Sequence, residues 1–266
     1  MSVSLAFSPC PNDTFVFHAW VHGLVPGAPP VEVTYADVDV TNTEALGGAF
    51  DVVKVSYGAL PWLLDRYALL PCGGALGYGC GPLVLTNGGD VTGTVAVPGE
   101  RTTAYLLFRL WSAAHPPARI EVVPFHEIMP GVAGGRYDAG LVIHEARFTY
   151  QRYGLTAVAD LGEWWQAETG LPIPLGAILA KRETVDPAAA AEWVRASVRH
   201  AWAYPAASQE YVLAHAQEME PDVVTQHIGL YVNRFTEDLG EEGYAAVRAL
   251  LTRSAEAELV PPVSDL

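Results

Sequence analysis

A histidine follows a short apolar segment, at a position where a side chain can act as a base. Residues Gly140–Ile143 have the pattern of a buried strand, and His144 comes directly after them. In open α/β sheets, ligands bind in the crevice outside the carboxyl ends of the strands. Histidine changes protonation near neutral pH, so His144 is a candidate for proton transfer in such a crevice. The alternative is a structural histidine that hydrogen-bonds a nearby loop.

A lysine interrupts a second apolar segment. Lys54, one of only two lysines in the chain, stands in the valine-rich stretch Asp51–Tyr57. An ammonium group that faces a cleft would attract a carboxylate ligand in an otherwise acidic protein. Ser56, two residues further on, lies on the same face of a strand. We therefore expect Lys54 and Ser56 to bind substrate; a position on the solvent-facing rim of the strand is the alternative.

Two threonines follow the strand pattern Thr94–Val97 and a Pro-Gly turn. Thr102 is a typical N-cap for a helix that begins near Thr103. The free N–H groups and the dipole at a helix N-terminus favour an anion. Thr102 and Thr103 are therefore candidate ligands of a substrate carboxylate, with a plain helix cap as the alternative.

The first strand pattern, Val3–Phe7, ends in a polar, proline-rich turn. Its Ser8, Asn12 and Thr14 provide hydrogen-bonding groups that we expect to face the same cleft. Asn12 or Asp13 can cap the helix that follows, and a simple capped turn is the alternative.

Strand and helix patterns alternate through the first two thirds of the chain, which indicates an α/β fold with mostly parallel strands. The predicted strands are Val3–Phe7, Val31–Ala36, Val52–Val55, Leu83–Thr86, Thr94–Val97, Ile120–Val123, Gly140–Ile143 and Leu175–Ala180. The predicted helices of this part are Asp13–Val21, Thr41–Gly47, Leu60–Arg66, Thr103–Ala114 and Glu127–Gly134.

The last third of the sequence is helical. Its predicted helices are Pro187–Tyr204, Ser208–Gln217, Pro221–Asn233 and Gly240–Glu258. Segments rich in Gly and Pro near residues 81–85 and 171–176 suggest two crossings between domains. We expect residues 1–84 and 176–266 to form a larger α/β domain with the helical tail, and residues 85–175 a smaller inserted domain. Two domains with paired crossings can close around a ligand by a hinge motion.

Several common sites are disfavoured by the sequence. The glycine run Cys72–Gly81 leads into a strand rather than a helix, unlike a nucleotide-binding loop; a close-packed crossing or a hinge fits it better. Cys10, Cys72 and Cys80 lack metal-ligand spacing and are expected to be reduced thiols. No zinc-binding spacing and no Gly-x-Ser-x-Gly elbow is found.

Composition narrows the class of partner. The chain has 266 residues, 50% of them hydrophobic, and a formal net charge of -15. Such an acidic protein is a poor candidate for binding nucleic acid or an anionic membrane surface. The N-terminus resembles a first strand rather than a signal peptide, and no apolar segment is long enough to span a membrane. We expect a cytoplasmic protein whose partner is a small molecule.

At the level of longer motifs, the sequence resembles the 1,4-dihydroxy-6-naphthoate synthases of the futalosine route to menaquinone. The motifs that carry the resemblance run in order along nearly the whole chain. They are Ser8–Phe15, Lys54–Tyr57, Gly73–Gly77, Val97–Gly99 with Thr102–Tyr105, Ile143–Tyr150, Asp160–Trp165, Thr169–Pro172 and Pro174–Ile178.

The resemblance implies a fold and an activity. The fold is α/β with a two-domain architecture like that of periplasmic binding proteins (type II), with a central cleft and C-terminal helices. The activity is a carbon-carbon lyase reaction that converts cyclic dehypoxanthine futalosine into 1,4-dihydroxy-6-naphthoate and releases dihydroxyacetone. The family's base falls on His144, and its substrate-binding residues on Lys54, Ser56, Thr102 and Thr103. No metal or organic cofactor is implied, and the oligomeric state stays open.

Two other functions fit the same architecture. One is a non-enzymatic carboxylate-binding protein that delivers a ligand to a transporter, although no export signal is visible. The other is a chorismate dehydratase-like lyase, which handles another carboxylated, elimination-prone substrate. The stretch His144–Tyr150 fits the naphthoate synthases better than the dehydratase.

Overall fold

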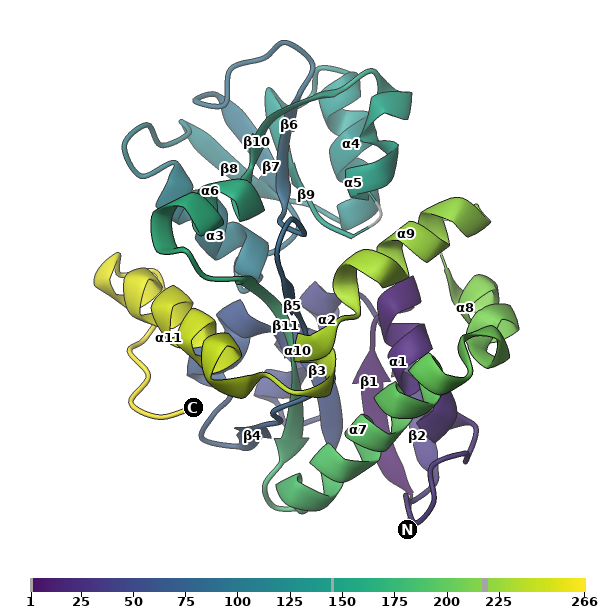
Figure 1. Cartoon of the computed structure of the whole chain (residues 1–266). Coiled ribbons are helices and arrows are strands. Elements are labelled where there is room, and N and C mark those ends of the chain that lie inside the picture. Colours follow the sequence, from purple (N-terminus) through teal and green to yellow (C-terminus); the bar gives the residue numbers. More distant parts are fainter. Residues whose placement is uncertain (1, 145, 217–219) are drawn as a thin grey trace.

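A computed structural model of the chain shows two lobes, each built around a β-sheet (Figure 1). The structure describes residues 2–144, 146–216 and 220–266. The sheet of the lobe that holds the N-terminus consists of β1 (Val3–Phe7), β2 (Val31–Tyr35), β3 (Val52–Ser56), β4 (Tyr67–Leu69), β5 (Ala75–Gly77) and β11 (Ile173–Lys181).

The first sheet has the strand order β2-β1-β3-β11-β4, with β5 also paired to β11. Strand β1 runs parallel to β2 and β3, whereas β11 runs antiparallel to β3, β4 and β5. The register places Ile178 opposite Lys54 and Gly176 opposite Ser56. The returning strand β11 therefore packs directly beside the strand that carries the predicted lysine and serine.

The second sheet has the strand order β10-β6-β9-β7-β8. Its strands are β6 (Leu83–Thr86), β7 (Thr94–Val97), β8 (Arg119–Val122), β9 (Ala139–Val142) and β10 (Thr156–Asp160). Strand β7 is parallel to β8 and β9, while β6 is antiparallel to both β9 and β10. The prediction of mostly parallel strands is therefore wrong, because strands in both lobes, including β6 and β11 next to the crossings, run against their neighbours.

The helices follow the predicted pattern closely, with a few additions. They are α1 (Pro11–Val21), α2 (Val38–Leu46), α3 (Thr103–Trp111), α4 (Phe125–Ala133), α5 (Ala146–Thr149), α6 (Leu161–Thr169), α7 (Pro187–Ala203), α8 (Gln209–His215), α9 (Pro221–Tyr231), α10 (Arg234–Glu237) and α11 (Gly240–Glu256). The expected helix Leu60–Arg66 is instead the 3-10 helix η1 (Tyr57–Trp62), which has Pro61 inside it, followed by turns. Gln217, the predicted end of α8, lies outside the described residues.

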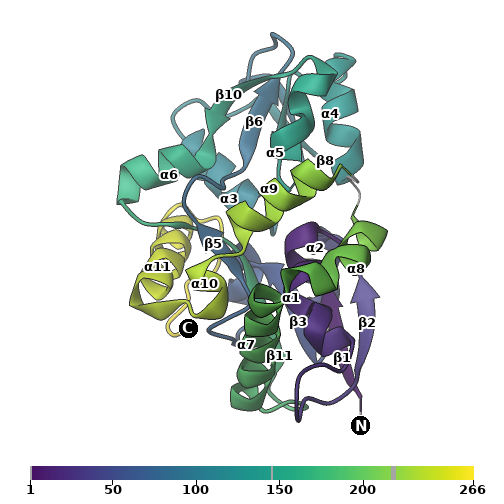
Figure 2. The same ribbon diagram turned by 45° about the vertical axis from the view of Figure 1, so that its right-hand side comes forward.

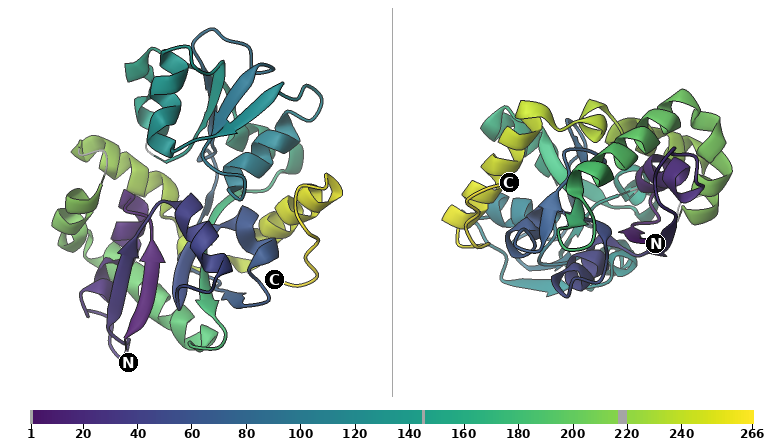
Figure 3. Two further views of the ribbon diagram at one scale, coloured as in Figure 1. Left: turned by 180° about the vertical axis from the view of Figure 1, so that it is seen from behind. Right: turned by 90° about the horizontal axis from the view of Figure 1, so that it is seen from below.

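The helical tail packs mainly on the first lobe, as the sequence suggests. Helices α1 and α7 lie against each other over the first sheet, and Phe17, Trp20 and Val194 are buried in the core between them. The Ser197 hydroxyl donates a hydrogen bond to the Val16 carbonyl, which satisfies a polar group inside this apolar layer. Figure 3, seen from behind and from below, shows α11 beside the first lobe and away from α7.

The lobes are joined where β5 leads to β6 and where α6 leads to β11 (Figure 2). A Cβ atom added to Gly81 would lie 2.1 Å from the Gly162 nitrogen, so only glycine allows the two backbones to approach so closely there. The glycine run is thus close-packed at this crossing. A domain boundary at residues 84/85 and 175/176 remains a prediction. None of the helices in the described part of the chain has the length and apolar character needed to cross a bilayer.

Candidate active site

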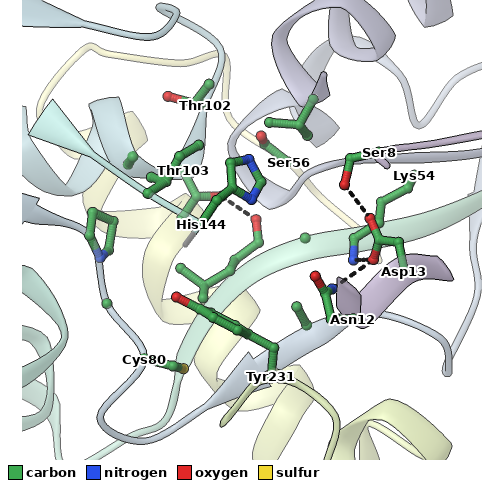
Figure 4. Close-up of a pocket in the computed structure, with 18 of the residues that line it drawn as sticks. Ser8, Asn12, Asp13, Lys54, Ser56, Cys80, Thr102, Thr103, His144 and Tyr231 are labelled. Atoms are coloured by element: carbon green, nitrogen blue, oxygen red, sulfur yellow. Dashed lines mark hydrogen bonds and ion pairs between the residues drawn. The ribbon is translucent and has the colours of Figure 1, made fainter. Parts of the chain in front are cut away.

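A pocket lies between the two lobes, at the strand ends singled out from the sequence. Its wall includes seven of the eight predicted site residues: Ser8, Asn12, Lys54, Ser56, Thr102, Thr103 and His144. They come from four places: the turn after β1, strand β3, the N-terminus of α3 and the turn after β9. Figure 4 shows these side chains converging on one space.

Thr14 is the exception, and its predicted place in the cleft is wrong. Its side chain is buried, and its hydroxyl donates to the Cys10 and Pro11 carbonyls of its own helix. Helix α1 begins at Pro11, so Asn12 and Asp13 lie in its first turn, and neither caps the helix from its side chain. The physical reason is that the helix begins at Pro11, two residues before the predicted start at Asp13. The Thr14 hydroxyl then bonds to backbone carbonyls of the preceding turn, whereas Asn12 and Asp13 line the pocket.

Lys54 is buried and forms an ion pair with Asp13, a partner that sequence reasoning missed. The Ser8 hydroxyl donates to Asp13 Oδ2 at 2.7 Å, and the Asn12 amide donates to Asp13 Oδ1 at 2.7 Å (Figure 4). The charge of Lys54 is therefore balanced inside the protein before any ligand arrives. Since a buried ion pair persists only when its remaining hydrogen-bonding atoms are satisfied, Ser8 and Asn12 act as supports of this pair.

Ser56 is held by α2. The Asn42 amide donates to the Ser56 hydroxyl oxygen at 3.0 Å, and its carbonyl accepts from the Ser56 backbone N–H at 2.7 Å. Within the described residues, no acceptor takes the hydrogen of this hydroxyl. Ser56 can therefore donate to a ligand oxygen, from the same strand face as Lys54.

The N-terminus of α3 forms another wall of the pocket. Thr102 caps the helix as predicted: its hydroxyl accepts from the Tyr105 N–H at 3.1 Å and donates to the Gly99 carbonyl at 2.7 Å. The Thr103 hydroxyl donates to the Leu175 carbonyl at 2.9 Å and accepts from the Gly58 N–H at 3.0 Å. Both hydroxyl hydrogens are thus already used, so the backbone amides of the first helical turn are the groups suited to an anion.

His144 stands just beyond the end of β9, with a backbone φ of 54°. This left-handed conformation is uncommon for residues other than glycine and is one of the strained geometries found at functional sites. The Phe125 ring meets the imidazole edge to face, with ring centroids 5.5 Å apart. From the other lobe, Cys10 Sγ lies 3.3 Å from His144 Nδ1. The ring is therefore held from both lobes.

The surroundings of His144 keep its imidazole neutral. Burial is the largest effect and brings the pKa of His144 to about 4; the negative charge of Asp13 acts to raise this pKa, and the positive charge of Lys54 acts to lower it to a smaller extent. A neutral imidazole with one nitrogen held by the protein is suited to accept a proton at the other nitrogen.

The Arg147 side chain is directed to other partners, although the Arg147 backbone N–H donates to the His144 carbonyl at 3.4 Å. The side chain forms an ion pair with Asp160 and donates to the Gly81 carbonyl at 2.9 Å, so it braces the crossing between the lobes. Glu145, the residue that follows His144, lies outside the described residues. Cys10, within the motif Ser8–Phe15, is the orienting contact that the structure reveals, and its place in the polar turn was the only sequence signal.

Helix α9 supplies two pocket residues that sequence reasoning missed, His227 and Tyr231. Their spacing of four residues on a predicted helix was the only available hint, because such residues share a face. Cys80 also lines the pocket, and burial raises the pKa of its thiol to about 12, so this thiol stays protonated at neutral pH. In the described part of the chain, no three His, Cys, Asp or Glu side chains are grouped so that they could hold a metal ion.

Comparison with known proteins identifies the family. The sequence pattern of the menaquinone biosynthesis family matches residues 3–256. A 1,4-dihydroxy-6-naphthoate synthase of Streptomyces coelicolor is 63% identical, over 98% of this chain and 95% of that protein. The chain belongs to the menaquinone biosynthesis family. A second member of this family, a 1,4-dihydroxy-6-naphthoate synthase of Thermus thermophilus, is 47% identical over 98% of this chain and 97% of its own length.

Solved structures confirm the expected fold of this family member. A protein from Archaeoglobus fulgidus is 30% identical and has a TM-score of 0.90, covering 97% of this chain and 98% of its own. A Candida albicans protein described as having the generic periplasmic binding protein fold superimposes with a TM-score of 0.70 at 10% identity, over 100% of this chain and 92% of that one. The fold prediction is therefore confirmed at the level of the periplasmic-binding-protein architecture.

Proposed function

We propose that this protein is a 1,4-dihydroxy-6-naphthoate synthase. It converts cyclic dehypoxanthine futalosine into 1,4-dihydroxy-6-naphthoate and releases dihydroxyacetone, as a carbon-carbon lyase of menaquinone biosynthesis. The observation that carries the proposal is the His144 imidazole, in contact with Cys10 through Nδ1, in the wall of a pocket that also contains Lys54. Membership of the menaquinone biosynthesis family supports the assignment.

Substrate binding rests on the groups that attract a carboxylate. Lys54 supplies a positive charge, and Ser56 supplies an O–H donor. The backbone N–H groups of Thr103 and Ala104, at the N-terminus of α3, supply further hydrogen-bond donors. These groups come from both lobes, so a carboxylate bound between them favours the closed arrangement of the lobes. Closure excludes water and strengthens the electrostatic interactions within the pocket.

The chemical step begins with proton removal by His144. With the hydrogen of the neutral ring on Nδ1, donated to Cys10 Sγ, Nε2 is the nitrogen that accepts the proton whose loss starts carbon-carbon cleavage and aromatisation of the substrate ring. A positioned general base of this kind contributes a factor of roughly 10²–10⁴ to the rate. The protein acts on this small-molecule carboxylate in the cytoplasm, without nucleic acid.

One experiment tests this function against its alternatives. The purified protein is incubated with cyclic dehypoxanthine futalosine and, separately, with chorismate, and the products are identified by mass spectrometry. We expect 1,4-dihydroxy-6-naphthoate and dihydroxyacetone from the first substrate and no turnover of the second. Turnover of chorismate alone would favour the dehydratase, and binding without turnover of either would favour a carboxylate-binding protein.

The matched control is His144→Asn. Asparagine is among the few residues that readily adopt a positive φ, so this variant keeps the backbone of residue 144 while it removes the base. We expect both His144→Asn and His144→Ala to fold and to lose turnover. Near-normal turnover by either folded variant would remove His144 from the role of base.

A further inference from the structure

Arg147 is a charged residue behind the pocket wall, three positions after the proposed base. It lies on α5, and 20% of its side chain is exposed. It is not among the described residues that line the pocket. Its guanidinium forms an ion pair with Asp160 and donates to the carbonyl of Gly81, which does line the pocket. An arginine fork can hold two acceptors in a fixed geometry, so this contact fixes positions as well as balancing charge.

The Gly81 carbonyl lies where the strand pairing next to His144 stops. Strands β6 and β9 are antiparallel, and their last pair toward the pocket is Leu83 with Val142. Continued by two residues, the same register leads to Gly81 and His144. Pro82 comes between and has no N–H group, so it cannot donate a hydrogen bond that would continue the ladder. The guanidinium therefore links the two segments at the place where the backbone ladder ends.

The turn that carries His144 depends on such a link because its backbone is strained. The φ of His144 is 54°, and a residue other than glycine keeps such a conformation only when its surroundings fix it. The Arg147 N–H donates to the His144 carbonyl at 3.4 Å, so the backbone of Arg147 is part of this turn. The side chain of the same residue ties the turn to Gly81, before β6, and to Asp160, at the end of β10.

We propose that Arg147 is a positioning residue for the lyase reaction: it anchors the turn after β9 to Gly81 and Asp160, and so fixes the place of the His144 ring in the pocket. This inference rests on the proposed function, because it takes His144 as the base. Without the anchor, the turn relaxes and the ring is less often in the reactive orientation. The chemical step then slows, while the groups that bind the carboxylate keep their places.

Two variants remove the anchor in different ways. Arg147→Ala removes the guanidinium. Asp160→Asn removes its charged partner but keeps the cap of α6, because Asp160 Oδ1 accepts from two backbone N–H groups of that helix and asparagine is an equally good N-cap. Arg136→Ala is the matched control, since Arg136 forms an ion pair with Glu127 in the same lobe but is 65% exposed and does not line the pocket.

The first test measures kcat and KM for cyclic dehypoxanthine futalosine. We expect Arg147→Ala to lower kcat by about tenfold to hundredfold, the effect of a misplaced reacting group, and to change KM by about twofold or less. Asp160→Asn should act in the same direction, and Arg136→Ala should change neither constant. Added ethylguanidinium should restore part of the kcat of Arg147→Ala because it can replace the missing fork, whereas ethylammonium, which lacks a planar fork, should not.

The second test does not depend on turnover. An NMR titration measures the pKa of the His144 ring, whose signal is identified by its absence in His144→Asn. We expect this pKa to rise from about 4 toward its ordinary value in Arg147→Ala, because a released turn exposes the ring to water. The same rise is expected in Asp160→Asn, although the loss of a negative charge alone would lower the pKa. The titratable groups near the ring that both variants leave unchanged are Cys10, Asp13, Lys54 and His227.

Several results would overturn the inference alone. These are an unchanged kcat in Arg147→Ala, a KM that rises as much as kcat falls, or a pKa of His144 that does not rise in both variants. Each would show that Arg147 supports the fold without positioning the base. If Arg147→Ala does not fold, Asp160→Asn decides by the same criteria. If the wild-type protein does not turn over the substrate, the proposed function fails, whereas the NMR titration still tests whether Arg147 holds the ring.

Discussion

Cys10 Sγ lies 3.3 Å from His144 Nδ1, and this contact joins the turn after β1 in one lobe to the turn after β9 in the other. Cys10 itself does not line the pocket. Within the described part of the chain, its side chain touches the site at the His144 imidazole. The orientation of the base therefore depends on the two lobes being together.

Replacement of Cys10 should slow the chemical step more than it weakens binding. We expect Cys10→Ala to lower kcat by about tenfold, the effect of one hydrogen bond that orients a reacting group, with little change in KM. Cys10→Ser, which can still hydrogen-bond Nδ1, should recover part of this loss. Steady-state kinetics of both variants provide the test; equal kcat values for Cys10→Ala and the wild type would mean that the contact does not position His144.

The pH dependence of activity should reflect the low pKa of His144. A base is active when it is unprotonated, and the pKa of about 4 keeps His144 unprotonated throughout the neutral range. We expect kcat/KM to stay level from neutral pH down to about pH 5 and to fall as the pH drops through about 4. An acid limb near 6.5, the usual pKa of histidine, would contradict the burial of this base. Assays at neutral pH after exposure to acid control for irreversible unfolding.

The pair Lys54–Asp13 should contribute to stability as well as to binding. Asp13→Asn removes one charge of a buried ion pair and is expected to lower the free energy of unfolding by about 3–5 kcal/mol. The double variant Asp13→Asn/Lys54→Met should regain much of this stability but not substrate affinity. Denaturant unfolding and equilibrium binding measure the two effects; a double variant with normal affinity would exclude Lys54 from carboxylate binding.

Thr103 should act through the contact between the lobes. Thr103→Val leaves the buried Gly58 N–H and the Leu175 carbonyl without their partner, so the closed arrangement becomes less favourable. We expect a KM that is higher by about tenfold, whereas Thr103→Ser, which keeps the hydroxyl, should remain near wild type. Unchanged KM and kcat in Thr103→Val would exclude this role.

Gly176 should influence the position of the Lys54 side chain, although glycine has no side chain of its own that could contact the substrate. A Cβ atom at residue 176 would lie 2.8 Å from Lys54 Cε, so Gly176→Ala must displace the lysine side chain. We expect a raised KM and a loss of about 1–3 kcal/mol of stability, the usual cost of overpacking. Gly229→Ala is the control, because a Cβ there meets nothing within 4 Å. A wild-type KM in Gly176→Ala would show that the position of Lys54 is not critical.

The sequence by itself determined the strand ends and most of the residues that stand on them. A strand and the turn after it are local features, so periodicity alone could place Lys54 and Ser56 on a strand and His144 just after one, as candidates for the cleft. The cap at Thr102 was predictable for the same reason. The short strands β4 and β5 were not, because a three-residue strand is stabilised by its partner β11 rather than by a pattern of its own.

Only the tertiary structure decided which of these residues interact. Asp13 and Lys54 are separated by 41 residues, Cys10 and His144 by 134, and Asn12 and His227 by 215, so no local pattern relates the members of each pair. Their contacts arise because the chain crosses twice between the lobes and then returns α9 to the pocket. The lowered pKa of His144 follows from these contacts, because it depends on which side chains surround the ring rather than on the neighbours of His144 in the sequence.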